Sequence, residues 1–202
     1  MSEKRRPFLL GLTGSIGMGK STTAQMFVDL GCAVWDADAA VHRLYHVGGA
    51  AVAPLAEVLP EAIEDGAVSR ERLKAMISAD AAVLKTIERI VHPLVAQDRA
   101  AFIQNATAEI LVFDIPLLFE TGGDGAMDAV ACVKVAPDIQ RARVLARGTM
   151  SEAQFEQILA KQMPIAEKIA RSDYVVHTDT LDQARVQVEK IVNTIKEGAD
   201  HA

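Results

Sequence analysis

A glycine-rich segment near the start of the sequence has the residue types and spacing that bind nucleotide phosphates. From Gly14 to Ser21 it fits the pattern G-x-x-x-x-G-K-[ST]. The glycines let the backbone curl so that successive N–H groups point into one hollow, which can receive phosphate oxygens. Lys20 would then reach the β- and γ-phosphates, and Ser21 would offer its hydroxyl to Mg²⁺. The predicted ATP-binding residues are Gly14, Ser15, Ile16, Gly17, Met18, Gly19, Lys20, Ser21 and Thr22.

The residues on either side of this segment agree with that interpretation. An apolar run typical of a strand precedes it, and a helical pattern that includes Ala24, Phe27 and Val28 follows it. A helix that begins near Lys20 would direct the positive end of its dipole at the phosphates. The alternative is a glycine-rich turn with a solvated lysine, and it leaves the adjacent lysine and serine unexplained.

The same chemistry requires an acid at the end of a neighbouring strand. Asp114 directly follows the apolar residues 110–113, which is the spacing expected for a magnesium-linked aspartate. An aspartate that closes a strand is often only a turn residue. Beside a phosphate site the magnesium role is favoured, so Ser21 and Asp114 are the predicted metal-binding residues.

Two further acids follow the apolar run 32–35 and are separated by one residue. If the chain stays extended there, Asp36 and Asp38 point to the same side, at a strand end where open α/β sheets bind ligands. One of them could accept the proton of an attacking hydroxyl, while the other orients reacting groups or Mg²⁺-bound water. The alternative is a helix start that Asp38 caps, and the two roles are compatible.

Cations for a transferring phosphoryl group are predicted in the segment 140–147. On a helix, Arg143 and Arg147 are i,i+4 neighbours, and neither has an acid three or four residues away. An anion would relieve their repulsion, so a catalytic phosphate clamp competes with the alternative of a solvated helix face. Lys161 and Lys168, further along the chain, are expected to be surface charges.

A nucleotide-binding loop also occurs in switch and regulatory proteins. Guanine-specific switches usually carry N-K-x-D, whereas the two asparagines of this chain, Asn105 and Asn193, are followed by alanine and threonine. A small-molecule kinase is therefore favoured over a GTPase-like switch. A nucleotide-binding assembly or regulatory module is a third alternative.

The composition excludes several other classes of protein. Of the 202 residues, 50% are hydrophobic and 24% are charged, so a disordered chain is excluded. The net charge of −6 argues against a general nucleic-acid coat. No apolar run approaches the roughly 18–20 residues of a membrane span. Cys32 and Cys132 resemble buried free thiols, which indicates a reducing compartment. Together, the charge, the short apolar runs and the thiols predict a soluble cytoplasmic protein without nucleic-acid or membrane partners.

The predicted elements place the candidate residues on an α/β fold of the P-loop NTPase type. Short apolar runs without alternation, with helices between them, are typical of a doubly wound parallel sheet. The five predicted strands are 8–12, 32–35, 110–113, 129–135 and 174–176. The single domain would have its core at about 8–38, 108–137 and 172–202, a helical substrate-binding insertion at about 39–107 and a helical lid at about 138–171.

The two helical segments carry end signals. In the insertion, where no strand is predicted, Ser69 is a candidate cap. His92 is a further candidate cap, because Pro93 fits the first position of a helix. In the lid, Ser151 and Gln154 have the spacing of a capping box.

Together these residues resemble the dephospho-CoA kinases, ATP-dependent enzymes that phosphorylate the 3′-hydroxyl of the dephospho-CoA ribose. The matching pieces run in family order across almost the whole chain. They are L-T-G-S-I-G-M-G-K-S-T (12–22), D-A-D-x-x-x-H (36–42), V-H-P-L-V (91–95), D-I-P-L-L-F-E (114–120), Q-x-x-R-x-x-x-R (140–147), Gln162 and S-D-Y-V-V (172–176). Many kinases share the first piece, whereas D-A-D, H-P and P-L-L-F-E together are far more specific.

The resemblance implies the last step of coenzyme A biosynthesis, with ATP, dephospho-CoA and Mg²⁺. Asp38 would be the base, and Arg143 or Arg147 would come from a mobile lid that closes over ATP. From residue type alone, 117–119 would belong to the core. The resemblance instead gives an acceptor site with Asp36, His92, Pro93, Pro116, Leu117, Leu118, Phe119 and Glu120. A monomer or small homo-oligomer is expected.

Two positions depart from the family pattern. The chain has Arg147-Gly148 where the family often has Arg-Asp, and His177-Thr178 where it often has an asparagine. The second departure leaves the adenine contact near His177 open. The alternative function is another small-molecule P-loop kinase, such as a nucleoside or nucleoside-monophosphate kinase.

Overall fold

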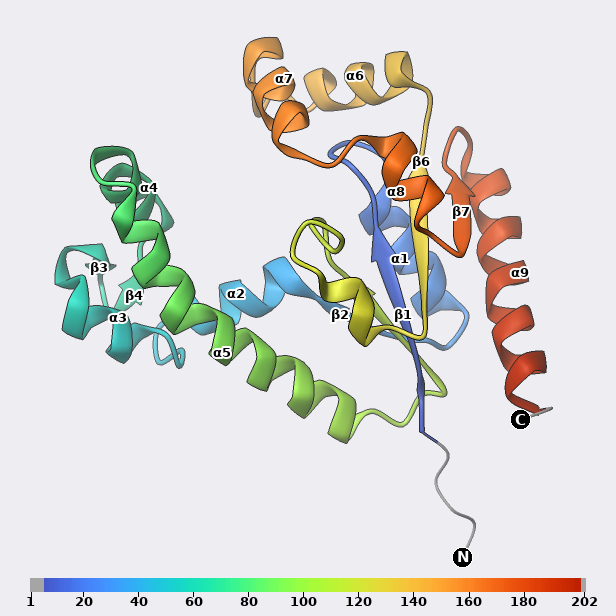
Figure 1. Ribbon diagram of the computed structural model, residues 1–202, viewed down its shortest axis with the longest axis horizontal. Coiled ribbons are helices and arrows are strands. Elements are labelled where there is room, and N and C mark those ends of the chain that lie inside the picture. Colours follow the sequence, from blue (N-terminus) through green and yellow to red (C-terminus); the bar gives the residue numbers. More distant parts are fainter. Residues whose placement is uncertain (1–5, 201–202) are drawn as a thin grey trace, which may run out of the picture. The chain divides into compact units, whose positions relative to one another are not determined.

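The computed structural model describes residues 6–200, which form two compact units. One unit joins the chain up to Trp35 to the chain from Thr107 onward, and it contains a five-stranded sheet of order β2-β5-β1-β6-β7 (Figure 1). The strands are β1 (Phe8–Thr13), β2 (Ala33–Asp36), β5 (Ile110–Asp114), β6 (Ala129–Lys134) and β7 (Tyr174–His177). All five predicted strands are confirmed, each to within one residue at both ends.

The strand register explains why the candidate residues gather at one edge of the sheet. β1 runs parallel to β5 and β6, and β6 runs parallel to β7. Leu12 pairs with Asp114, and Thr13 pairs with Cys132. Because the carboxyl ends of parallel strands meet at the same edge, the loop after β1 lies beside the end of β5.

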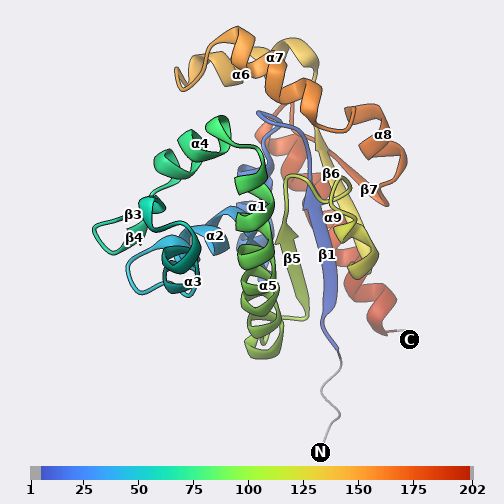
Figure 2. The ribbon, with the colours of Figure 1, turned by 60° about the vertical axis from the view of Figure 1, so that its left-hand side comes forward.

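Helices and a loop cover the two faces of this sheet. α1 (Lys20–Asp29) and α9 (Leu181–Asp200) pack side by side on one face (Figure 2), where Leu10 and Leu12 contribute to the core. Gly11 lies between these leucines and faces the opposite side, because side chains alternate along a strand. A Cβ at Gly11 would meet Leu118, which belongs to a second, smaller apolar cluster. Leu118 lies in the loop after β5, and η2 (Gly123–Ala126) follows it in the sequence.

The predicted lid, residues 138–171, lies in the connection between β6 and β7 and is called the lid segment below. It comprises α6 (Pro137–Ala146), α7 (Glu152–Lys161) and α8 (Ile165–Ala170). The capping box at the start of α7 is confirmed: the Gln154 N–H donates to Ser151 Oγ at 3.3 Å, and the Ser151 N–H donates to Gln154 Oε1 at 2.8 Å. No helix within residues 6–200 has the length and apolarity needed to cross a membrane.

The second unit, Asp36–Ala106, has its own apolar core around Leu55, Leu73 and Ile87. Its elements are α2 (Ala37–Tyr45), α3 (Val52–Val58), η1 (Pro60–Ala62), β3 (Ile63–Glu64), β4 (Ala67–Val68), α4 (Arg70–Ala79) and α5 (Ala82–Asn105). Ser69 caps α4 as predicted, accepting from the Arg72 N–H at 3.4 Å.

Two predictions for this unit are wrong. The antiparallel pair β3–β4 was not expected, although its turn residues Asp65 and Gly66 form the Asp-Gly pair typical of tight hairpins, with φ of 49° and 77°. Pro93 does not begin a helix, and His92 caps none, because both lie inside α5. The His92–Pro93 bond is trans. The helix continues through Pro93 because Ile87 and Val91 anchor the preceding turns in the core.

Candidate active site

The phosphate-binding loop crosses from β1 to α1 on a backbone that requires glycine. Gly17 and Gly19 have φ of 77° and 86°, in the left-handed region that a side chain disfavours. A Cβ at Gly17 would also collide with the Val144 side chain of α6. The loop therefore passes directly beneath α6. Ser21 and Thr22, in the first turn of α1, are exposed, so their hydroxyls are accessible.

Side chains distant in sequence hold this loop in place. The Ile16 N–H donates to Gln162 Oε1 at 3.2 Å, and the Gln140 side-chain amide donates to the Ile16 carbonyl at 2.7 Å. Thr178 Oγ1 donates to the Met18 carbonyl at 2.7 Å. Sequence reasoning gave Gln140 and Thr178 no role; the only signal was that Gln140 begins the Q-x-x-R-x-x-x-R pattern. The loop is thus fastened before any ligand binds.

The loop lysine and the acid at the end of β5 are in direct contact. Lys20 Nζ forms an ion pair with Asp114 Oδ1, and the two side chains are 16% and 2% exposed. In so little water, the carboxylate stabilises the ammonium and fixes its position. Lys20 is consequently held at the strand edge, where a phosphate group on the loop amides would lie within its reach.

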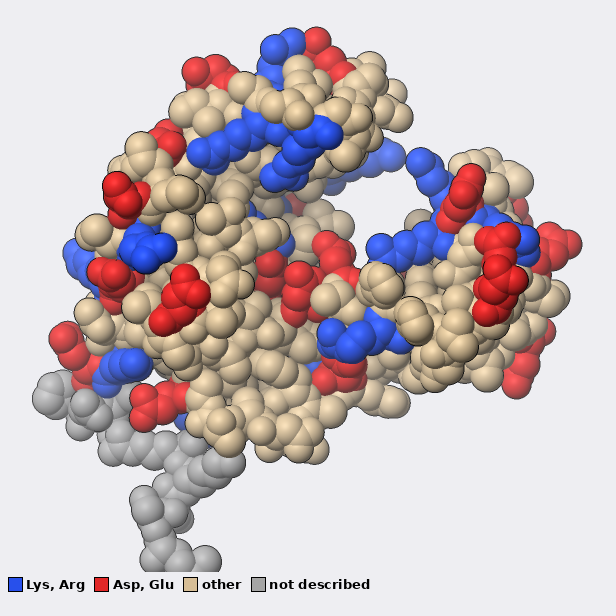
Figure 3. All heavy atoms as spheres, turned by 180° about the vertical axis from the view of Figure 1, so that it is seen from behind, with Lys and Arg blue, Asp and Glu red and all other residues tan. Residues whose placement is uncertain are grey.

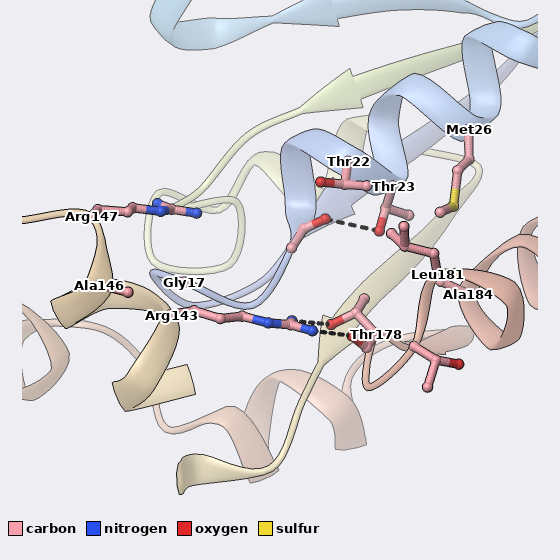
Figure 4. A pocket seen from close by; sticks show the side chains of 12 residues that line it. Gly17, Thr22, Thr23, Met26, Arg143, Ala146, Arg147, Thr178, Leu181 and Ala184 are labelled. Carbon is pink, nitrogen blue, oxygen red and sulfur yellow. Dashed lines mark hydrogen bonds between the residues drawn. The ribbon is translucent and has the colours of Figure 1, made fainter. Parts of the chain in front are cut away.

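A cavity of about 390 Å³ opens next to the loop (Figure 4). It is lined by Gly17, Gly19, Thr22, Thr23, Met26, Arg143, Ala146, Arg147, Thr178, Thr180, Leu181 and Ala184. These residues come from the loop, α1, α6 and the start of α9. Apolar side chains lie toward one end, and the loop glycines and two guanidinium groups lie elsewhere around it. That combination suits a molecule with a flat apolar part and a polyanionic part.

The two lid arginines differ in what they bind. Arg143 Nη2 donates to the Thr178 carbonyl at 2.7 Å, and Nη1 donates to Thr178 Oγ1 at 3.3 Å (Figure 4). The exposed Arg147 guanidinium has no hydrogen-bond or ion-pair partner within the described part of the chain. Arg143 is therefore part of the cavity wall, whereas Arg147 is available to an incoming anion.

The lid segment is basic in an acidic protein. It contains six Lys and Arg residues and four Asp and Glu residues, whereas the whole chain carries a net charge of −6. Figure 3 shows Lys and Arg side chains gathered along the edge of the α6–α7 part of the lid segment that faces the core of the same unit. A local excess of positive charge favours binding of a polyanion at this edge.

The two acids after β2 have different surroundings. Asp36 is the N-cap of α2, and its Oδ1 accepts from the Ala39 N–H at 2.9 Å. The alternative interpretation, in which Asp38 caps this helix, is therefore wrong. Asp38 lies in the first turn and is exposed, and its carboxylate has no partner among residues 6–200. Among the described residues, the Asp38 carboxylate is thus not engaged and could accept a proton from a ligand. The Asp36 carboxylate is already bonded to the Ala39 N–H.

The segment Pro116–Glu120 is only partly accessible. Leu118 and Phe119 are buried in the core, as their types suggested, whereas Leu117 is 42% exposed. Glu120 Oε1 accepts from the Met163 N–H at 2.8 Å and pairs with Lys168 at 2.8 Å. Burial opposes ionisation of the Glu120 carboxyl, but these hydrogen bonds outweigh it and lower its pKa. The exposed side chain suited to ligand contact here is that of Leu117, whereas the side chain of Glu120 is only 18% exposed.

The end of β7, where the chain departs from the family pattern at His177 and Thr178, is also defined. The His177 N–H donates to Gln187 Oε1 at 3.0 Å, and the His177 carbonyl accepts from Gln187 Nε2 at 3.1 Å. His177 does not line the cavity, whereas Thr178 does. At this end of the sheet, the residue that lines the cavity is therefore Thr178.

Comparison with known families identifies the family of this chain. The family model described as dephospho-CoA kinase matches residues 8–183, which include the loop, both acids, the predicted acceptor segment and the predicted lid. The chain belongs to the dephospho-CoA kinase family. It is accordingly a P-loop kinase.

Relatives in this family match along nearly their whole length. A dephospho-CoA kinase of Ruegeria pomeroyi is 70% identical over 195 residues, which are 96% of this chain and 99% of the relative. A dephospho-CoA kinase of Jannaschia sp. is 59% identical, over 95% of this chain and 98% of the relative. The match therefore extends over the predicted insertion and the predicted lid as well as the sheet.

Solved structures share the fold. A protein of Thermus thermophilus, TT1252, superposes with a TM-score of 0.85 at 29% identity, covering 94% of this chain and 98% of that one. A dephospho-CoA kinase from Campylobacter jejuni gives a TM-score of 0.68 at 21% identity, covering 95% and 98%. The predicted fold class, a P-loop kinase with a five-stranded parallel sheet, is confirmed.

Proposed function

We propose that this chain transfers the γ-phosphoryl group of ATP to the 3′-hydroxyl of dephospho-CoA and so completes coenzyme A. The observation that carries the proposal is the Lys20–Asp114 pair, in a chain of this family. Gly19, next to Lys20, lines the cavity together with Arg147, whose guanidinium has no partner among residues 6–200. The pair provides the phosphate end of a nucleotide site, and family membership provides the acceptor.

ATP would occupy the cavity with its phosphates on the loop. The loop amides and the N-terminus of α1 receive the phosphate oxygens, and Lys20 neutralises charge on the β- and γ-phosphates. Met26, Leu181 and Ala184 give the adenine an apolar surface. Arg143, fixed on Thr178, closes the side of the cavity.

Asp38 would act as the general base. Its carboxylate takes the proton of the 3′-hydroxyl as that oxygen attacks the γ-phosphorus, and the bond from the phosphorus to the β-γ bridging oxygen breaks to leave ADP. Arg147 would stabilise negative charge on the transferring group, because no group of the described residues engages its guanidinium. Closing of the lid segment would exclude water and so suppress ATP hydrolysis.

Mg²⁺ fits the donor set of this site. The exposed Ser21 hydroxyl and the Asp114 carboxylate are oxygen ligands of the kind that Mg²⁺ prefers, and such ions are usually held by one or two carboxylates together with substrate phosphates. When bound, Mg²⁺ supplies charge neutralisation at the phosphates. Asp114 has the additional task of holding Lys20.

The acceptor would contact Leu117 and Glu120, and also Asp36, His92 and Pro93 from the second unit. His92 and Pro93 are exposed on α5, so their side chains are accessible to a ligand. Asp36 would contribute mainly by setting the direction of α2, since its carboxylate caps that helix. Pro116, Leu118 and Phe119 would shape the segment from within.

The organisation and location of the protein follow the same proposal. We infer a single kinase domain with a core, an acceptor-binding insertion at about 39–107 and a lid at about 138–171. The buried free thiols Cys32 and Cys132 support a reducing compartment, the cytoplasm. A monomer or small homo-oligomer is sufficient, because the proposed residues come from one chain.

A coupled assay of ADP release tests the function. Purified protein is given ATP and Mg²⁺ with dephospho-CoA, or with a panel of nucleosides and nucleoside monophosphates, and the product is identified by mass. Dephospho-CoA is expected to stimulate ADP release and to gain one phosphoryl group. Stimulation by a nucleoside or nucleotide instead would identify another kind of P-loop kinase.

A further inference from the structure

Lys168 of α8 is completely buried, which contradicts its predicted place on the surface. Its exposed fraction is 0%, and it is among the largest fully buried side chains of the described residues. Lysine is almost never fully buried unless its ammonium is paired, because an ion loses its hydration in the interior. The site description above gives this ammonium no part in the chemistry, so its burial needs a reason.

The Lys168 ammonium binds two points of the acceptor segment. Nζ donates to the Pro116 carbonyl at 3.1 Å and pairs with the Glu120 carboxylate at 2.8 Å. Pro116 and Glu120 are the two ends of the predicted acceptor motif. One buried ammonium group thus contacts both ends of segment 116–120.

The Pro116 carbonyl also connects this segment to the phosphate-binding loop. It accepts a second hydrogen bond, from Thr13 Oγ1 at 3.1 Å, and Thr13 is the last residue of β1 before the loop. The carbonyl is therefore shared between the strand that carries the loop and the helix that ends the lid segment. Asp114, which holds Lys20, lies two residues before it.

Further contacts of the same region reinforce this attachment. The Met163 N–H donates to Glu120 Oε1 at 2.8 Å. The Arg171 guanidinium lies 4.5 Å from the centre of the Phe119 ring and pairs with Asp124 at 2.8 Å. The residues around α8 therefore fasten the acceptor segment at several points, and Lys168 is the only fully buried one among Met163, Lys168 and Arg171.

We propose that Lys168 is a positioning residue for the acceptor substrate, which sets the place of segment 116–120 relative to the phosphate-binding loop. It touches neither substrate; it acts through the Pro116 carbonyl and the Glu120 carboxylate. This inference rests on the proposed function. A lysine suits this position, because the Pro116 carbonyl and the Glu120 carboxylate are two acceptors. The ammonium group has three N–H donors and can bond to both at once.

The first test is the variant Lys168→Met, which keeps most of the side-chain volume and removes the ammonium. The KM for dephospho-CoA is expected to rise at least about tenfold, which corresponds to about 1.4 kcal/mol, while the KM for ATP changes less than about twofold. Acceptor-independent ATP hydrolysis should stay at the wild-type rate. Lys161→Met is the matched control, because Lys161 is exposed in the same segment and should change none of these values.

A second variant separates positioning from folding. Lys168→Met leaves the Glu120 carboxylate without its cation, so the melting temperature should fall; adding Glu120→Gln removes the unpaired charge and should restore much of it. The KM for dephospho-CoA should stay raised in the double variant above that of Glu120→Gln alone. Recovery of both quantities together would show that the ammonium serves folding only and would overturn the proposal.

The two proposals fail differently. If the wild-type protein does not phosphorylate dephospho-CoA, the proposed function is wrong. If the wild-type protein does so, and Lys168→Met folds with an unchanged KM for dephospho-CoA, only the role of Lys168 is wrong. Should Lys168→Met not fold, the double variant provides the same comparison.

Discussion

The side-chain amide of Gln140 donates a hydrogen bond to the carbonyl oxygen of Ile16 at 2.7 Å. The N–H of Ile16 donates to Gln162 Oε1 at 3.2 Å. One residue of the phosphate-binding loop is therefore bonded both to α6, through Gln140, and to the residue that follows α7, Gln162. Gln140 is 3% exposed, which shields its bond from water. The shape of the loop therefore depends on two glutamines that lie outside the loop.

Replacing either glutamine should weaken ATP binding. In Gln140→Ala and in Gln162→Ala, the KM for ATP is expected to rise about fivefold, because a net hydrogen bond contributes about 1 kcal/mol. The KM for dephospho-CoA should stay unchanged. Steady-state kinetics with each substrate varied in turn provide the measurement. Gln157→Ala, at an exposed position of α7, is the control and should behave as the wild type.

The Lys20–Asp114 pair should be separable into a stability part and an activity part. Lys20→Met leaves the Asp114 carboxylate, which is 2% exposed, without its cation, so the free energy of unfolding should fall by about 3 kcal/mol. Activity should be almost abolished. The double variant Lys20→Met/Asp114→Asn should regain most of the stability and none of the activity. Urea unfolding and the ADP assay measure the two parts; activity in the double variant would contradict the assignment.

Replacing Asp36 should affect mainly stability, whereas replacing Asp38 should affect mainly turnover. Asp36→Ala removes the cap of α2 and should lower the free energy of unfolding by about 1 kcal/mol. Asp38→Ala removes an exposed, unpartnered carboxylate and should leave thermal stability unchanged while abolishing most turnover. Circular dichroism melts and kcat are measured for both. Near-normal turnover by Asp38→Ala would eliminate it as the base.

Of the two lid arginines, Arg143 should contribute mainly to ATP binding and Arg147 mainly to the phosphoryl-transfer step. Arg143→Ala removes a wall of the cavity that is bonded to Thr178, so the KM for ATP should rise about tenfold. Arg147→Ala removes a guanidinium that has no protein partner among the described residues, so kcat should fall on the order of a hundredfold. Varying ATP at saturating dephospho-CoA separates the two constants. The reverse pattern would exchange their roles.

Burial of Cys132 predicts a loss of stability in alkaline solution. Desolvation raises the pKa of this thiol to about 11 in the folded protein, against about 8.5 in an unfolded chain. Between these values the unfolded state loses the proton and the folded state keeps it. Stability that is complete below about pH 8.5 should therefore fall by up to about 1.4 kcal/mol per pH unit toward pH 11.

The variant Cys132→Ala isolates this contribution. Its free energy of unfolding, measured by urea titration from pH 7 to 11, should decline less steeply than that of the wild type. Because both proteins contain the same lysines and tyrosines, the difference in slope belongs to the thiol. Equal slopes would show that the thiol does not stay protonated in the folded protein.

Features that depend on near neighbours in the sequence could be predicted from the sequence. The loop pattern ending at Ser21 and the capping box of Ser151 and Gln154 both join residues a few positions apart. β5 was equally clear, because four apolar residues end at Asp114. In each case the spacing itself determines which groups can meet, so no tertiary contact had to be known.

Features that depend on distant partners could not be predicted. Lys168 looks like a surface lysine until the Pro116 carbonyl, 52 residues away, is placed beside it. Thr178 reaches Met18 across 160 residues, and nothing in its neighbourhood marks it as a support of the loop. For Pro93 the local rule failed for another reason. Burial of apolar side chains along α5 stabilises the helix enough to tolerate an interior proline, whose cost is about 3 kcal/mol.

The bonds of Ile16 to Gln140 and Gln162 attach the lid segment to the phosphate-binding loop at two places. Because α6 and α7 are each attached to the phosphate-binding loop, a closing movement of either helix would have to break one of these bonds or carry the loop with it. The connection between the two helices, residues 147–151, has no such bond to the loop among the described residues; Gly148 there has φ of 64° and Arg147 is exposed. Closure over ATP is therefore expected to displace Arg147 more than Arg143, whose guanidinium is bonded to Thr178.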